Sequence, residues 1–159
     1  MHVIDVLQQW SDNNAFFIWL RESTSVWAYP TVFFLHTLGL VFTAGACIVV
    51  DARLLGAARR LPVAAFARYF RAIWIGVAVT LLSGVVMLGS DVAAKVTNRL
   101  FPLKMAFVLA AIVLTAMLRK RVASAGVESN LSPSTRALAA ASLVSWIGAI
   151  ASGKFAAYF

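Results

Sequence analysis

The chain has 159 residues, of which 62% are hydrophobic and 13% are charged, and its mean hydropathy is +0.86. Charged residues make up about one quarter of an ordinary soluble domain, so the composition excludes that class and predicts an integral membrane protein. The formal net charge of +8 does not indicate a nucleic-acid partner. The basic residues lie at the ends of apolar runs, where they contact anionic lipid head groups.

The N-terminal 23 residues predict helical structure at the membrane surface. Apolar side chains recur there at helical spacing, at Val3, Ile4, Leu7 and Trp10. A second apolar run, residues 15–20, is too short to cross a bilayer. We therefore expect an N-terminal interfacial amphipathic segment ahead of the first span.

Four longer apolar runs follow. Between Pro30 and Asp51 there is no formal charge, and about 20 helical residues cover roughly 30 Å, the thickness of the hydrocarbon core. Gly76, Thr80 and Gly84 recur every four residues in the second run, a pattern typical of closely packed helices in lipid. We expect an all-α integral membrane four-helix bundle, one domain over residues 1–159, with spans at about 30–50, 73–89, 103–118 and 137–151.

The distribution of basic residues predicts the orientation in the membrane. Most of them fall in the loops after the first and third spans, at Arg53, Arg59, Arg60, Arg68, Arg71, Arg119, Lys120, Arg121 and Arg136. Fewer lie on the other side, at Arg21, Lys95, Arg99, Lys104 and Lys154. By the positive-inside rule both termini face outward, toward the periplasm if the chain belongs to a bacterial inner membrane.

His36 is the candidate functional residue, because an ionisable group at bilayer depth is costly to keep there. Phe33 and Gly39 share its helix face at three-residue spacing. The missing side chain at Gly39 offers room for a flat macrocycle, and Phe33 can stack on its edge, so one interpretation is a haem iron bound by His36. The other is a hydrogen bond from His36 to a serine or threonine of a neighbouring helix, with Gly39 as a packing contact.

Two lysines extend this candidate site. Lys104 lies in the first turn of the third span, after Pro102, where it can pair with a haem propionate or a quinone oxygen, or extend to the head groups as an anchor. Lys154 has the same two interpretations near the outer face. Asp51 is expected to pair with Arg53 or with an arginine of another inner loop.

The run Phe34-Leu-His36-Thr-Leu-Gly39-Leu resembles an uncharacterised family of small bacterial four-helix membrane proteins, as do Val50-Asp51-Ala-Arg53-Leu-Leu-Gly56, Ser142-Leu-Val-Ser-Trp146-Ile-Gly148 and Gly153-Lys154-Phe-Ala-Ala-Tyr158. Where that family usually has Asp-Leu-Arg and Gly-Arg-Trp, this chain has Asp-Ala-Arg and Gly-Lys-Phe. It is more distantly similar to the membrane domain of CopD-like copper-resistance proteins and to HemJ-type protoporphyrinogen oxidases. The HemJ resemblance implies that His36 and Lys104 take part in binding haem b.

Together these features predict a membrane haem b protein that moves electrons between the quinone pool and a membrane or periplasmic redox partner. His36 is the expected metal ligand, and Gly39, Phe33, Lys104 and Lys154 are expected around the cofactor. The iron is then five-coordinate, takes a sixth ligand other than histidine, or is shared between subunits of a homo-oligomer. Two alternatives are a cofactor-free structural or assembly subunit, and a copper or other metal transporter using His36, Cys47, Met87 and Met105.

Overall fold

The computed structural model describes residues 2–124, 131–156 and 158, and its regular structure there is entirely helical. Four long helices are apolar enough to cross a membrane, and three short helices and a 3-10 turn connect or cover them. The prediction of an all-α membrane bundle is therefore confirmed. In chain order the elements are α1 (His2–Asp12), α2 (Ala15–Glu22), α3 (Tyr29–Leu55), η1 (Val63–Phe66), α4 (Tyr69–Ser90), α5 (Val92–Thr97), α6 (Leu100–Ser124) and α7 (Pro133–Phe155).

The helix boundaries follow from local capping. Asn14 begins α2 by accepting a hydrogen bond from the Phe16 N–H at 3.0 Å, and Ser132 caps α7 just before a proline at the first helical position. Gly56 ends α3 with φ of 116°, a left-handed conformation that glycine adopts at no steric cost. Each expected span lies inside one of the long helices, which continue beyond it at both ends.

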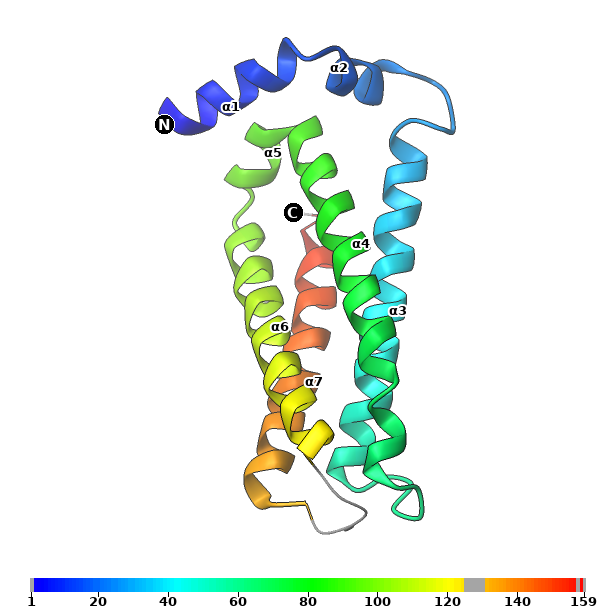
Figure 1. Cartoon of the computed structure of the whole chain (residues 1–159). Coiled ribbons are helices and arrows are strands. Elements are labelled where there is room, and N and C mark those ends of the chain that lie inside the picture. The colour runs from blue at the N-terminus through cyan, green and yellow to red at the C-terminus, as the bar shows by residue number, and fades with distance from the viewer. Residues whose placement is uncertain (1, 125–130, 157, 159) are drawn as a thin grey trace.

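The four long helices form two antiparallel pairs (Figure 1). α3 packs most extensively on α4, and α6 on α7, while α3 and α7 make the main contact between the pairs. The largest hydrophobic cluster lies where the pairs meet, and includes Cys47, Val50, Ile73, Leu118 and Trp146. The α3–α7 contact therefore determines how one pair is placed on the other.

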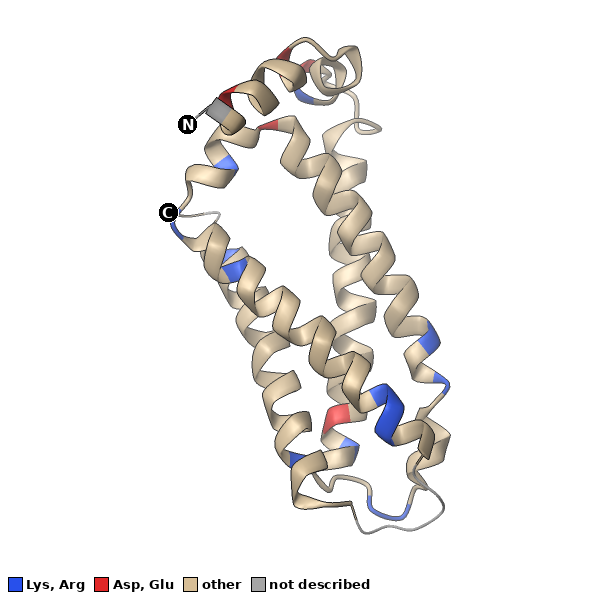
Figure 2. Ribbon diagram, turned by 60° about the vertical axis from the view of Figure 1, so that its left-hand side comes forward, with Lys and Arg blue, Asp and Glu red and all other residues tan. Residues whose placement is uncertain are grey.

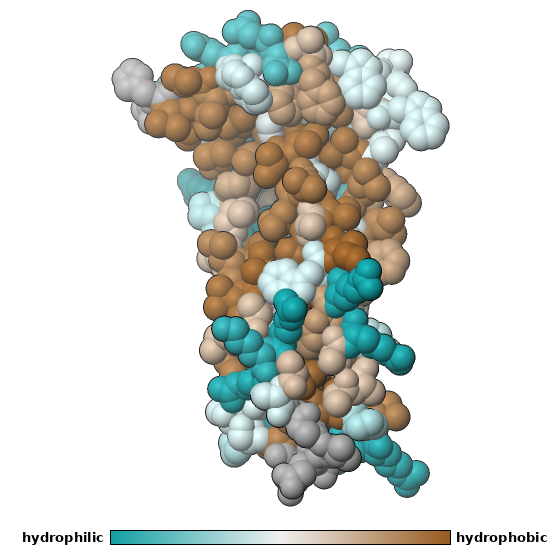
Figure 3. All heavy atoms as spheres, in the orientation of Figure 1, coloured by the Kyte–Doolittle hydropathy of each residue, from teal (hydrophilic) through white to brown (hydrophobic). Residues whose placement is uncertain are grey.

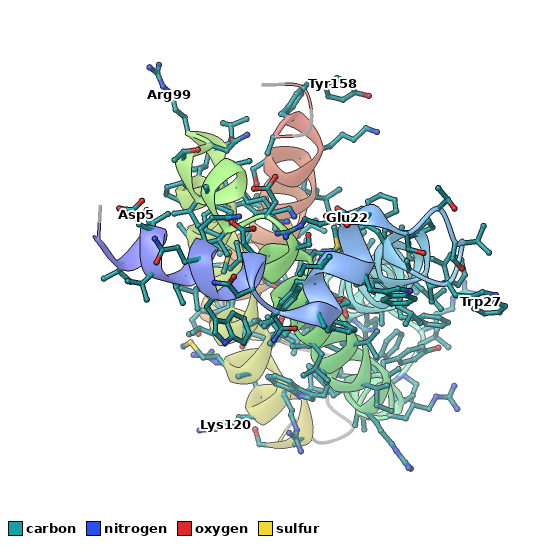
Figure 4. All side chains as sticks on the ribbon, turned by 90° about the horizontal axis from the view of Figure 1, so that it is seen from above. Asp5, Glu22, Trp27, Arg99, Lys120 and Tyr158 are labelled. Carbon is teal, nitrogen blue, oxygen red and sulfur yellow. The ribbon has the colours of Figure 1, made fainter. Side chains whose placement is uncertain are left out.

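α1, α2 and α5 lie across one end of the bundle, which we call the cap end (Figures 1 and 4). The Ser11 hydroxyl donates to the Gly89 carbonyl, and the Ala93 N–H donates to Gln8 Oε1 at 2.9 Å. Arg21 donates to the Ser90 carbonyl at 3.1 Å. These bonds attach the amphipathic segment to the end of α4, where helix carbonyls lack partners within the helix.

The opposite end, which we call the basic end, carries the loops after α3 and α6. Lys and Arg residues gather there, whereas the middle of the long helices has few charges (Figure 2). On the face that Figure 3 shows, apolar side chains form a band between the two ends. Many large apolar side chains of the long helices are exposed, among them Phe34, Val41, Leu82 and Val144. Such a band suits contact with lipid, so the chain is a multi-pass membrane protein.

Candidate functional site

The histidine at the centre of the candidate site is held by the neighbouring helix. His36 lies in the half of α3 nearer the cap end, and its Nδ1 is 3.1 Å from the Ser83 hydroxyl oxygen of α4. The Ser83 hydroxyl is also 2.5 Å from the Val79 carbonyl and 3.2 Å from the Thr80 carbonyl of its own helix. This contact is the hydrogen bond to a neighbouring serine that one interpretation of the sequence expects.

These distances favour one tautomer of the imidazole. A serine hydroxyl has one proton to donate, and the Ser83 oxygen lies 2.5 Å from the Val79 carbonyl of the preceding turn. With that proton donated to the carbonyl, the Ser83 oxygen accepts from His36, and the ring proton is then on Nδ1. His36 Nε2 then keeps its lone pair, the form in which an imidazole binds a metal or accepts a proton.

Gly39 and Gly76 bring α3 and α4 close together. A Cβ atom added to Gly39 would lie 2.7 Å from Thr80 Oγ1 and 3.0 Å from the Gly76 carbonyl oxygen. The space beside Gly39 is thus filled by α4, and the room expected there for a macrocycle does not exist. Gly39 is the packing contact that the second interpretation of the sequence predicts.

Gly84 of α4, and not Gly39, lies against the imidazole ring of His36. A Cβ atom on Gly84 would lie 3.2 Å from His36 Cε1, so the ring rests directly on the α4 backbone at this position. The sequence shows Gly84 as part of the four-residue spacing of small residues, but it does not show which of those residues receives His36. The pairing register of α3 and α4 supplies that information.

Lys104 faces the interior of the bundle. It is half-buried, and its Cε and Nζ lie 3.4 and 3.6 Å from the position of a Cβ on Gly153 of α7. The positive charge of Lys104 is close enough to interact electrostatically with both His36 and Lys95. Burial lowers the pKa of Lys95 below its ordinary value, the nearby Asp91 carboxylate raises it in part, and the Lys104 charge lowers it further.

Lys95 also caps the C-terminal end of α4 with hydrogen bonds. Its ammonium donates to the Met87 carbonyl and, at 3.0 Å, to the Ser90 hydroxyl, and it lies 5.8 Å from the centroid of the Tyr29 ring. The side chain therefore neutralises part of the negative end of the α4 dipole. The sequence places Lys95 in a return loop and gives no sign of this role.

The other two predicted residues lie at the periphery. Phe33, one turn before His36, is 54% exposed. Lys154 is exposed, and its Nζ lies 5.4 Å from the centroid of the Tyr158 ring, which points away from the bundle (Figure 4). The structure thus brings His36 and Lys104 toward one interior region and leaves Phe33 and Lys154 on the surface.

The imidazole meets the chemical requirement for an axial haem ligand. In such sites Nε2 binds the iron while Nδ1 donates to an outer acceptor, which fixes the ring orientation. His36 has that arrangement with Ser83 as the acceptor. Lys104 supplies a positive charge in the same half of the bundle, as a propionate requires.

The fold and the site define the class as a multi-pass helical membrane protein with a half-buried histidine that contacts a buried serine of the neighbouring helix. Comparison with models of known families, with curated proteins and with solved structures found no match for the chain. Its function is therefore inferred from the geometry of its own residues.

Proposed function

We propose that the chain is a small haem b protein of a bacterial inner membrane, and that it passes electrons between the quinone pool and a redox partner on the periplasmic side. The observation that carries this proposal is the contact between His36 Nδ1 and the Ser83 hydroxyl oxygen at 3.1 Å, which leaves Nε2, on the other side of the ring, as the nitrogen for an iron. A bound haem supplies one-electron chemistry that the protein side chains lack.

The chain's own residues have distinct roles in this proposal. His36 provides the axial nitrogen, and Ser83 orients the ring and increases its basicity by accepting the Nδ1 proton. Lys104 offsets the negative charge of a propionate or of a quinol anion. Lys154 and Phe33 are exposed, and in this proposal they would contact a quinone or a partner that approaches from lipid.

The proposed orientation follows from charge and topology. α1 and the end of α7 lie at the cap end, and the loops between the paired helices lie at the basic end (Figures 1 and 2). Because basic loops are retained on the cytoplasmic side, both termini and the His36 half of the bundle are on the periplasmic side in this proposal.

The two alternative functions have less support from the geometry. An assembly subunit would dock onto a larger complex through a free face of small residues, but Gly76 of α4 packs against Gly39 and Thr43 of the same chain. A copper path through His36, Cys47, Met87 and Met105 needs clustered ligands, but His36 contacts Ser83 of α4 whereas Cys47, eleven residues further along α3, contacts the Thr115 hydroxyl of α6.

The test is a visible absorption spectrum of the purified protein, oxidised and dithionite-reduced, after expression with ample haem. We expect a Soret band and reduced α and β bands in the wild type and in His2→Ala, the matched control at the second histidine. His36→Ala should lose these bands while keeping its helix content.

Two results would contradict the proposal. One is a wild-type spectrum without haem bands, which would leave the assembly subunit as the better account. The other is a His36→Ala spectrum that equals the wild type, which would place the axial ligand elsewhere.

A further inference from the structure

A second polar site lies in the half of α3 nearer the basic end. Asp51 is 1% exposed, and its Oδ2 has no hydrogen-bond partner within the described residues. The Ser142 hydroxyl of α7 lies near this carboxyl and is fully buried, and it too has no hydrogen-bond partner among the described residues. Two buried and unsatisfied polar groups thus lie near each other where the two helix pairs meet.

The expected ion pair with Arg53 is absent from the described part of the chain, where the one salt bridge joins Arg21 to Asp12. Arg53 instead donates to the Leu61 carbonyl at 2.8 Å and to the Arg59 carbonyl at 3.3 Å. The Arg53 guanidinium thus binds backbone carbonyls of the loop after α3. The Asp51 carboxyl has no counter-ion among the described residues.

Within the part of the chain that the structure describes, no other element near Asp51 supplies a compensating charge. The basic residues at this end of α4, α6 and α7 are exposed, at Arg68, Arg71, Arg119, Lys120 and Arg136. Arg121 is half-buried but donates to the Ser134 and Thr135 hydroxyls. The titratable neighbour one turn earlier on α3 is Cys47, whose thiol cannot carry a compensating positive charge. A carboxylate in this place would be buried and uncompensated, which is strongly unfavourable.

One added proton removes the uncompensated charge. A proton on Oδ2 makes the carboxyl neutral and turns it into a donor, and after a small side-chain movement the Ser142 oxygen can accept from it while the Ser142 hydroxyl donates to the preceding turn of α7. Ser145 and Ser152 on the same helix already donate in this way, to the Ala141 and Gly148 carbonyls at 2.8 and 2.7 Å.

We propose that Asp51 and Ser142 form a proton-binding site, at which the Asp51 carboxyl takes up one proton from the basic side of the bundle and releases it to that side. An O–H bond forms at Oδ2 when a hydrated proton arrives, and it breaks when the proton returns to water. The site is separate from His36 and goes beyond the proposed haem function. Asp51 lies 15 residues further along α3, or roughly 22 Å at 1.5 Å per residue.

Infrared difference spectroscopy of the whole protein in detergent tests this proposal. At neutral pH we expect the carbonyl stretch of a protonated carboxylic acid, which moves to lower wavenumber in D2O and disappears on titration to alkaline pH. Asp51→Asn should lose the band, whereas Asp5→Asn, at an exposed acidic residue, should keep it. Ser142→Ala should shift the band without removing it, because the hydrogen-bond partner changes and the carboxyl remains.

The D2O shift and the Ser142→Ala spectrum keep the test decisive if Asp51→Asn fails to fold. A spectrum with only carboxylate bands at neutral pH would overturn the proposal. So would a band that responds to sodium at constant pH, since that result would identify a metal-cation site. The same measurement on His36→Ala should be unchanged, so a failure of the haem proposal leaves this test intact.

Discussion

At the scale of single residues, the site depends on how one serine directs one histidine. The Ser83 hydroxyl gives its proton to its own helix and accepts from His36 Nδ1, so the imidazole is held in one tautomer. Without that acceptor, both tautomers and several ring orientations become accessible. The availability of His36 Nε2 is therefore a property of α4 as much as of α3.

Ser83→Ala tests this dependence. Loss of an outer-shell partner typically weakens metal or cofactor binding roughly 10- to 100-fold, and we expect that loss for haem titrated into the apoprotein, with the helix content unchanged. Ser145→Ala is the matched control, because Ser145 is similarly buried and donates to its own helix. Equal haem affinity in both variants would contradict the assigned role of Ser83.

The sequence identifies His36 but only part of its surroundings. A lone histidine in a charge-free apolar run stands out by the cost of burying it, so that residue and Lys104 could be predicted. Ser83, Gly84 and Gly153 could not, because they contact these side chains only through the register of paired helices. The charge-neutral environment of Asp51 was likewise hidden, since the neighbouring Arg53 suggests an ion pair that does not form.

At the scale of elements, the closest contact is the crossing of α3 and α4. The backbones approach at Gly39 and Gly76, and the Thr43 and Thr80 side chains flank that contact. This approach sets the distance between His36 and Ser83, which lie within two turns of it. The packing of small residues is thus a precondition for the geometry of the site.

Gly39→Ala should separate the two helices. Its Cβ would stand 3.0 Å from backbone atoms of Gly76 and Thr80, which cannot rotate away as a side chain can, so we expect a loss of about 1–3 kcal/mol in unfolding free energy. Gly45→Ala on the same helix meets nothing within 4 Å and should be neutral or slightly stabilising. Thermal unfolding in detergent compares them, and equal stabilities would contradict the assigned contact.

Hydropathy predicts the membrane-crossing parts of these elements better than their ends. α4 begins at Tyr69 and not near residue 73, and α6 continues to Ser124, because helical hydrogen bonding persists where the sequence has become polar. The short helix α5 was missed. Its signal is local, since Asp91 accepts from the Ala94 N–H at 3.1 Å and caps only six residues.

At the scale of the whole molecule, the two ends of the bundle differ in charge and in chemistry. The cap end holds His36, Lys95 and Lys104 under the amphipathic helices, and the basic end holds the buried Asp51. The membrane class followed from composition, and the number of spans followed from the four apolar runs along the chain. The division into two pairs did not, because several pairings of four apolar helices satisfy the same hydropathy pattern.

The most direct test of the account is chemical rescue of the proposed axial ligand. His36→Gly purified without haem should bind haem weakly, and free imidazole should restore the Soret and α bands, since it can occupy the space that the side chain leaves and supply the missing nitrogen. The result that would contradict the account is a His36→Gly protein with wild-type haem bands before any imidazole is added.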